Sequence, residues 1–205
     1  MNDIEKLAEL FREFPGIGPR QAKRFVYFLL RRNNGYNGEL SKLIAEIKKD
    51  VTVCENCFRF FPHDHARGSL CNICLDDTRE KETLMLVAQD SDFESIEKTH
   101  SYNGYYFILG GIVPILEKSP EKKFRQNELL THLQKRMHAG LKEIIIALNY
   151  NPEGEHMLSY LSALLRPLTE KHGVKISTLG RGLSTGTELE YSDVNTLKNA
   201  LKNKQ

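Results

Sequence analysis

The sequence predicts a multi-module α+β protein, in which a helical N-terminal module and a cysteine-rich module precede an α/β domain with a mainly parallel sheet. Three observations predict this order. Apolar residues recur at helical spacing up to residue 47, two C-x-x-C pairs follow, and from Glu82 continuous apolar runs alternate with helical stretches. We expect modules at 1–52, 53–77 and 78–178, followed by a C-terminal segment at 179–205 that holds a glycine-rich stretch and a helix.

Composition narrows the class of protein. The chain has 205 residues, 40% of them hydrophobic, which is enough for a core. No apolar run approaches the roughly 18 residues that a membrane helix needs, and Asp3 and Glu5 make the N-terminus unlike a signal peptide. We therefore expect a soluble, cytoplasmic protein without a membrane partner. The net charge is only +2, so nucleic-acid binding would depend on a local concentration of cations.

A helical hairpin is predicted at the N-terminus. An apolar stripe over residues 2–14 ends at Pro15-Gly16-Ile17-Gly18-Pro19, and helical spacing resumes over 21–32. In a helix-hairpin-helix, such glycines let the backbone approach closely, and the free N–H groups of the second helix favour a phosphate. A polar, glycine-rich connection is then expected at Asn33–Gly38, with a third short helix over Leu40–Ile47.

Local charge favours the interpretation of this hairpin as a DNA-binding element. No acidic residue lies between Glu13 and Glu39, whereas five residues in that interval are basic. We expect contact with the DNA backbone, without base specificity, through Gly16, Gly18, Arg20, Lys23 and Arg24. The alternative is an ordinary helical hairpin, in which the glycines shape the turn and the cations are solvated.

The four cysteines predict a metal site. Cys54, Cys57, Cys71 and Cys74 form two C-x-x-C pairs separated by thirteen residues. Each pair makes a tight turn that aims two thiolates at one point, so together they supply the four ligands of a closed, tetrahedral, structural Zn²⁺ site. The alternatives are two disulfides, which a reducing cytosol disfavours, and four unrelated buried thiols. His63 and His65 could replace a cysteine, but four cysteines already fill the coordination sphere.

The second half of the chain predicts a parallel sheet with acidic residues at one edge. Strands are expected at 84–88, 105–109, 143–149 and 174–178, with helices between them. Loops at the carboxyl ends of such strands form binding sites. These loops carry acids that could bind Mg²⁺ weakly or contact a partner, or could simply cap helices: Asp90, Asp92, Glu153 and Glu155. The Gly180–Glu190 segment lacks the lysine and spacing of a nucleotide-binding loop.

The order of these parts resembles the RecR family of bacterial recombination mediators. The residues that carry the resemblance are the Phe14–Arg20 turn, the cysteine quartet, the Asn149–Glu155 loop, and the segment from Gly180 to Tyr191. It implies a Toprim domain over the α/β part. It also implies a non-enzymatic, nucleoid-associated protein that forms dimers or tetrameric rings around gapped, single- or double-stranded DNA. It further implies action with RecO, and with RecF where present, to load RecA.

Two departures bear on catalysis. The usual glutamate after the first Toprim strand falls on Ala88, and Asn149 stands where a catalytic Asp-x-Asp would begin. An amide oxygen binds Mg²⁺ more weakly than a carboxylate, so we do not expect a catalytic pair of metal ions. The rival hypothesis is a Mg²⁺-dependent nuclease or topoisomerase-like enzyme built on the four acids named above.

Overall fold

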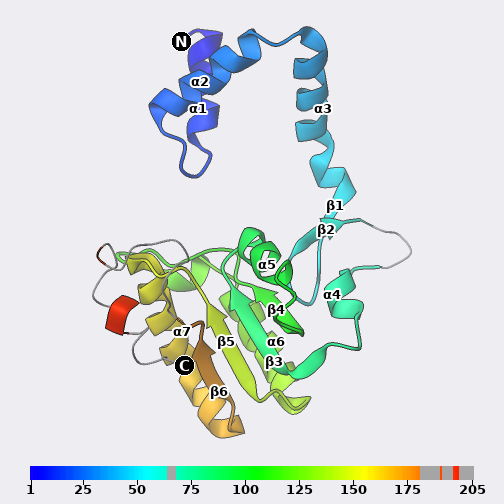
Figure 1. Cartoon of the computed structure of the whole chain (residues 1–205), viewed down its shortest axis with the longest axis vertical. Helices are drawn as coiled ribbons and strands as arrows, with labels where there is room; N and C mark the ends of the chain where they lie inside the picture. Colours follow the sequence, from blue (N-terminus) through cyan, green and yellow to red (C-terminus); the bar gives the residue numbers. More distant parts are fainter. Residues whose placement is uncertain (64–67, 181–189, 191–195, 199–205) are drawn as a thin grey trace. The chain divides into compact units, whose positions relative to one another are not determined.

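The computed structural model describes residues 1–63, 68–180, 190 and 196–198. The chain divides into two compact units, Met1–Thr52 and Val53–Gln205, which Figure 1 shows in sequence colours. In the described part of the chain, no helix is both long enough and apolar enough to span a bilayer. Most of the glycine-rich segment, and most of the helix expected near the C-terminus, lie outside the described residues.

The N-terminal unit is helical, as predicted. Helices α1 (Asp3–Arg12) and α2 (Pro19–Leu30) pack against each other around Ala8, Ala22 and Val26. A capping box starts α1, because the Asn2 side chain accepts from the Glu5 N–H and the Glu5 carboxylate accepts from the Asn2 N–H. These small buried residues bring the two helices close together, which fixes the turn between them.

The third helix is longer than the sequence predicts. Asn33–Gly38 was expected to be a connection, but α3 runs over Asn34–Asp50. The cause is the Asn33 side chain, which caps the helix by accepting a 2.8 Å hydrogen bond from the Tyr36 N–H. This cap offsets the low helix propensity of Gly35 and Gly38, which lie inside the first turns.

The cysteine-rich module opens the second unit. Strands β1 (Val51–Val53) and β2 (Phe60–Pro62) pair in a two-stranded sheet, and the short helix α4 (Asn72–Leu75) follows. The first cysteine pair lies between the two strands, and the second lies at the start of α4. A backbone hydrogen bond from the Cys54 N–H to the Arg59 carbonyl (2.9 Å) closes the first cysteine turn, and one from the Glu55 N–H to the Ser69 carbonyl (3.1 Å) connects the two halves of the module.

The rest of the unit is the predicted α/β domain. Its four strands are all parallel and lie in the order β4-β3-β5-β6. The strands are β3 (Glu80–Val87), β4 (Gly104–Ile108), β5 (Glu143–Ala147) and β6 (Lys175–Thr178). The helices are α5 (Asp90–Glu97), the 3-10 turn η1 (Pro120–Lys122), α6 (Gln126–His138) and α7 (Pro152–His172), which continues through Pro167.

The sheet is covered on both faces, as Figure 1 shows. On one face, strand residues such as Leu84 and Ile144 pack against Leu133 of α6 and Leu161 of α7. On the opposite face, strand residues pack against Phe93 of α5 and also against the cysteine-rich module: Met85, Val87, Tyr106 and Ile108 share a core with Cys54, Cys57, Phe61, Cys71 and Ile73. The cysteine-rich module therefore takes the place of a further helix on that face.

Candidate functional site

The four cysteine side chains gather at one point. Their Sγ atoms all lie within 4.8 Å of one another, and Cys57 Sγ lies 3.6 Å from Cys71 Sγ. All four are free thiols, three of them buried and Cys74 partly exposed. The N–H of Cys71 donates to Cys54 Sγ at 3.4 Å, the kind of bond that stabilises a negatively charged sulfur. These residues can hold a metal ion, and the disulfide alternative does not match their free thiols.

The close contact shifts the thiol pKa values in opposite directions. Hydrogen bonding to Cys57 lowers the pKa of the Cys54 thiol, and hydrogen bonding to Cys54 raises the pKa of the Cys57 thiol. A cluster of this kind cannot ionise fully without a cation, because four thiolates would repel one another in a buried space. A divalent metal ion would bind all four sulfurs as thiolates and release their protons.

The cysteine-rich module is fixed to the sheet by polar contacts as well as by packing. The Ile108 N–H at the outer edge of β4 donates a 2.8 Å hydrogen bond to the Cys57 carbonyl oxygen. The Phe60 N–H donates to Asp90 Oδ1, also at 2.8 Å. The Arg59 guanidinium lies 4.4 Å from the centre of the Phe93 ring on α5. The cysteine cluster and the α/β domain thus form one body.

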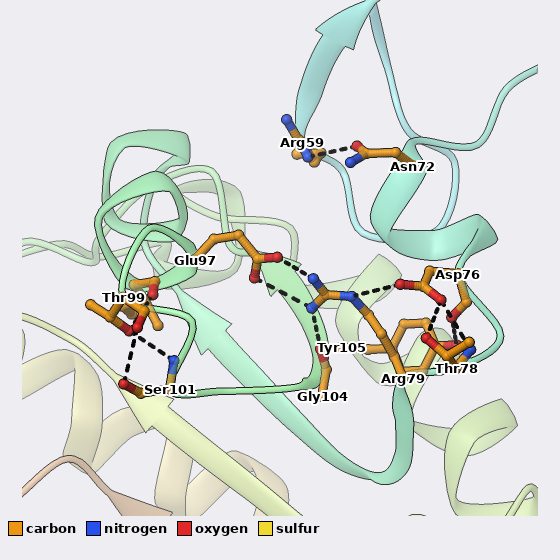
Figure 2. Close-up of polar contacts among 11 residues, drawn as sticks. Arg59, Asn72, Asp76, Thr78, Arg79, Glu97, Thr99, Ser101, Gly104 and Tyr105 are labelled. Carbon is orange, nitrogen blue, oxygen red and sulfur yellow. Dashed lines mark hydrogen bonds and ion pairs between the residues drawn. The ribbon is translucent and has the colours of Figure 1, made fainter.

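Arg79 connects the end of the module to α5 and β4. Its guanidinium donates to both carboxylate oxygens of Glu97 and, at 2.9 Å, to the Gly104 carbonyl oxygen, and it lies 3.8 Å from Asp76 (Figure 2). The Arg79 side chain is 9% exposed and that of Glu97 24% exposed. Sequence reasoning missed this pair, because residues 18 positions apart on different elements leave no periodic signal.

The hairpin presents the glycines as the sequence predicts. Gly16 has a φ of +77°, a backbone conformation that residues other than glycine rarely adopt. Gly18 is the N-cap of α2, and Pro19 occupies the first helical position. No side chain caps this helix end, and the space where a Cβ would lie on Gly16 or Gly18 is open. The first-turn N–H groups of α2 are therefore accessible to an anion.

The predicted cations lie on one face of α2. Arg20, Lys23 and Arg24 are all exposed, and positions i, i+3 and i+4 of a helix lie on the same side. The opposite side of α2 carries the buried Ala22 and Val26. The hairpin turn and the cations thus belong to one continuous surface of the N-terminal unit.

The four predicted acids do not form a metal site of this kind. Asp90 accepts from Phe60, and Asp92 accepts from the Gln89 N–H at 3.0 Å, which caps α5. Glu153 and Glu155 lie in the first turn of α7. Among the described residues, the only group of three or more His, Cys, Asp or Glu side chains close enough to hold a metal is the cysteine cluster. The structure gives Asp90 and Asp92 a role in capping and docking.

Comparisons with known proteins agree with this geometry. A model of the RecR helix-hairpin-helix matches residues 4–48, and a model of the Toprim domain matches residues 82–180. The recombination protein RecR of Bifidobacterium animalis subsp. lactis is 37% identical over 204 residues, which cover 98% of this chain and 95% of the relative. RecR of Dehalococcoides mccartyi (strain 195) is 36% identical over 98% of this chain and 93% of its own length.

The chain belongs to the RecR family. RecR proteins as distant as that of Cyanothece sp., at 31% identity, still align over 98% of this chain. The RecR helix-hairpin-helix corresponds to α1, α2 and most of α3, and the Toprim domain corresponds to the four-stranded sheet with its helices. The fold class predicted from the sequence is therefore confirmed.

Proposed function

We propose that this RecR-family chain is a non-enzymatic recombination mediator that binds the backbone of gapped, single- or double-stranded DNA through its hairpin. The observation that carries the proposal is the uncapped start of α2 beside an exposed face of cations: Arg20, Lys23 and Arg24. A helix N-terminus favours anions, and neighbouring cations neutralise phosphates and release counterions. Because Gly16 and Gly18 have no side chains, they allow the DNA strand to approach the protein backbone. Binding is then salt-dependent and independent of base sequence.

Family membership supports the wider role. We propose that the protein acts in the cytoplasm at the nucleoid with RecO, and with RecF where present, to load RecA on gapped DNA. We also propose that the cysteine cluster holds Zn²⁺, because four cysteine sulfurs in a compact, mostly buried cluster suit a tetrahedral d¹⁰ ion. The ion would stabilise the module without taking part in any reaction, since no coordination position is left for a substrate.

Self-association would complete the DNA-binding surface. One hairpin with a few cations binds weakly, whereas several linked copies gain avidity. The apolar stripe of α3 supports such assembly, because Leu43, Ile44 and Ile47 are 60%, 64% and 59% exposed. Leu10, Phe14 and Ile44 help to line an apolar groove of 540 Å³ in the same unit. We propose that a second copy covers this surface, giving the dimer or tetramer ring.

Fluorescence anisotropy with labelled gapped DNA tests the DNA contact. Arg20→Ala/Arg24→Ala should weaken binding on the order of tenfold at low salt and reduce the salt slope by about two. Lys48→Ala/Lys49→Ala is the matched control, because it removes the same charge at the far end of α3. Equal binding by the hairpin variant and the wild type would place the contact elsewhere.

Multi-angle light scattering tests assembly separately. Ile44→Glu/Ile47→Glu should lower the molar mass, because each substitution places a charge in the proposed apolar interface. Lys48→Glu/Lys49→Glu, at exposed charged positions of the same helix, should leave the mass unchanged. A mass that falls in neither variant would contradict the proposed interface.

A further inference from the structure

An aromatic side chain lies in the middle of the cationic face of α2. Residues 20, 23, 24, 27 and 31 follow the i, i+3, i+4 spacing of one helix face. Four of them are Lys or Arg, and the fifth is Tyr27, which is 50% exposed. Contacts with phosphates explain the cations. A phosphate group, however, offers no favourable contact to an aromatic ring.

Directly after Tyr27 in the sequence begins a second cluster, in which two aromatic rings contact an arginine. The Arg32 guanidinium lies 4.5 Å from the centre of the Phe28 ring and 5.2 Å from that of Tyr36. The two rings meet edge to face at 6.0 Å. Phe28 and Tyr36 are 44% and 40% exposed. Cation–π contact of this kind orients the guanidinium before any ligand arrives.

The apolar groove that we assign to self-association does not include these residues. Its lining comes from α1, from the other side of α2 and from α3, and contains none of Tyr27, Phe28, Arg32 or Tyr36. The aromatic residues therefore lie beside cations and outside the groove. Alternating cations and exposed aromatic rings are typical of surfaces that bind unpaired nucleic acid, because each base offers a π face for stacking.

Distance along the helix fits a strand that starts at the hairpin. Tyr27 follows Arg20 by seven residues, or about 10 Å at 1.5 Å per residue. About three nucleotides of a stacked strand, at 3.4 Å each, cover that length. In a duplex, the faces of those bases are buried between neighbouring pairs, so only an unpaired strand can use Tyr27.

We propose that the exposed side of α2 at Tyr27, together with Arg32 just after the end of the helix, is a single-strand subsite. Tyr27 stacks on an unpaired base, and Arg32, oriented by Phe28 and Tyr36, contacts the adjacent phosphate. This inference rests on the proposed DNA contact at the hairpin and adds to it a preference for the unpaired strand at a gap.

Titrations with oligo(dT) and with a blunt duplex of the same length, over a range of salt, test the subsite. Tyr27→Ala should weaken binding to the single strand about 5- to 100-fold. It should change duplex binding less than about twofold and leave the salt slope unchanged, since no charge is removed. Tyr27→Phe, which keeps the ring, should bind like the wild type. Arg32→Gln should reduce the salt slope by about one.

The outcomes separate this inference from the proposed function. Equal losses on single strand and duplex, or no loss, in Tyr27→Ala would overturn the subsite and leave the hairpin contact standing. A changed molar mass in Tyr27→Ala would also overturn it, because the ring would then belong to a protein interface. If the wild type binds neither DNA, both proposals fail. We expect DNA that carries 5-iodouracil to crosslink to the peptide that contains Tyr27, which would confirm the subsite directly.

Discussion

The carboxylate of Asp90, at the start of α5, accepts a 2.8 Å hydrogen bond from the backbone N–H of Phe60, which lies in the cysteine-rich module. The two residues are 30 positions apart in the chain. Asp90 thus ties β2 to the start of α5, and its location after the carboxyl end of β3 has a structural explanation without a metal.

Replacing Asp90 should therefore loosen the module. Asp90→Ala leaves the Phe60 N–H without its acceptor and should lower the free energy of unfolding by about 1 kcal/mol. Thermal denaturation and the rate of metal release to a chelator measure the effect. The control is Glu94→Ala on the same helix, because the exposed pair of Glu94 with Lys98 contributes little. No change with Asp90→Ala would mean that apolar packing alone positions β2.

A nicking assay on supercoiled DNA separates the mediator from the rival enzyme. With Mg²⁺ present we expect no cleavage by the wild type, since Asp90 and Asp92 are engaged in hydrogen bonds to backbone N–H groups. Cleavage that disappears in Asp90→Ala or Glu153→Ala would instead establish catalysis at the carboxyl edge of the sheet.

The Arg79–Glu97 pair should contribute strongly to stability as a unit. Arg79→Met removes the cation but leaves the Glu97 carboxylate partly buried, so we expect a loss of about 3 kcal/mol. Arg79→Met/Glu97→Leu should recover part of that loss, because the uncompensated charge is gone. Urea denaturation of both variants and of Glu97→Leu completes the double-mutant cycle. Additive effects of the single substitutions would contradict a coupled pair.

His132 should make the protein sensitive to mild acid. Burial, aided by the positive charges of Arg136 and Lys135, lowers the pKa of His132 to about 4. The neutral imidazole is therefore favoured in the folded state. As the pH falls below the unfolded value of about 6.5, the unfolded chain binds the proton more readily and the folded state loses stability until about pH 4.

Comparison with His132→Leu isolates this effect from acid release of the metal. The wild type should lose about 2 kcal/mol more than the variant between pH 7 and pH 5. The imidazole lies 5.3 Å from the Phe107 ring, so leucine can keep the apolar contact. Parallel pH profiles for the two proteins would show that His132 titrates normally.

Substituting one cysteine should release the metal and destabilise the second unit. We expect about one zinc ion per chain in the wild type and none in Cys57→Ser or Cys71→Ser. Their melting temperatures should fall, because both residues belong to the core that covers one face of the sheet. Native mass spectrometry measures the metal. His63→Ala is the control: zinc loss there would mean that a histidine takes part in binding.

The sequence predicted those elements whose signal is local. The two C-x-x-C pairs, the apolar strand predicted at 143–149 and the Gly16–Gly18 turn each reveal their structure within a few residues. The structure has all three, with the strand ending at Ala147. The predicted start of α3 was wrong. Gly35 and Gly38 have low helix propensity, and the stabilisation that offsets them comes from one capping side chain, Asn33. Tertiary context decides such cases.

Contacts between distant elements could not be predicted. Nothing near Asp90 in the sequence indicates that its carboxylate accepts a hydrogen bond from Phe60. Likewise, nothing near Arg79 indicates that it pairs with Glu97. In the same way, the alternation of strands and helices predicted a mainly parallel sheet but not that the cysteine-rich module would cover one face of it. Such pairings depend on how separate elements pack, which a single sequence does not encode in any periodic pattern.

The hydrogen bond between the Ile108 N–H and the Cys57 carbonyl has a consequence for how the protein aggregates. β4 is the outermost strand beside β3, and an unpaired outer strand can recruit strands from other molecules. The turn that contains Cys57 shields part of that strand. If the proposed ion holds that turn in place, removing the ion or oxidising the cysteines would expose the outer strand to intermolecular β-pairing, and we expect aggregates to form.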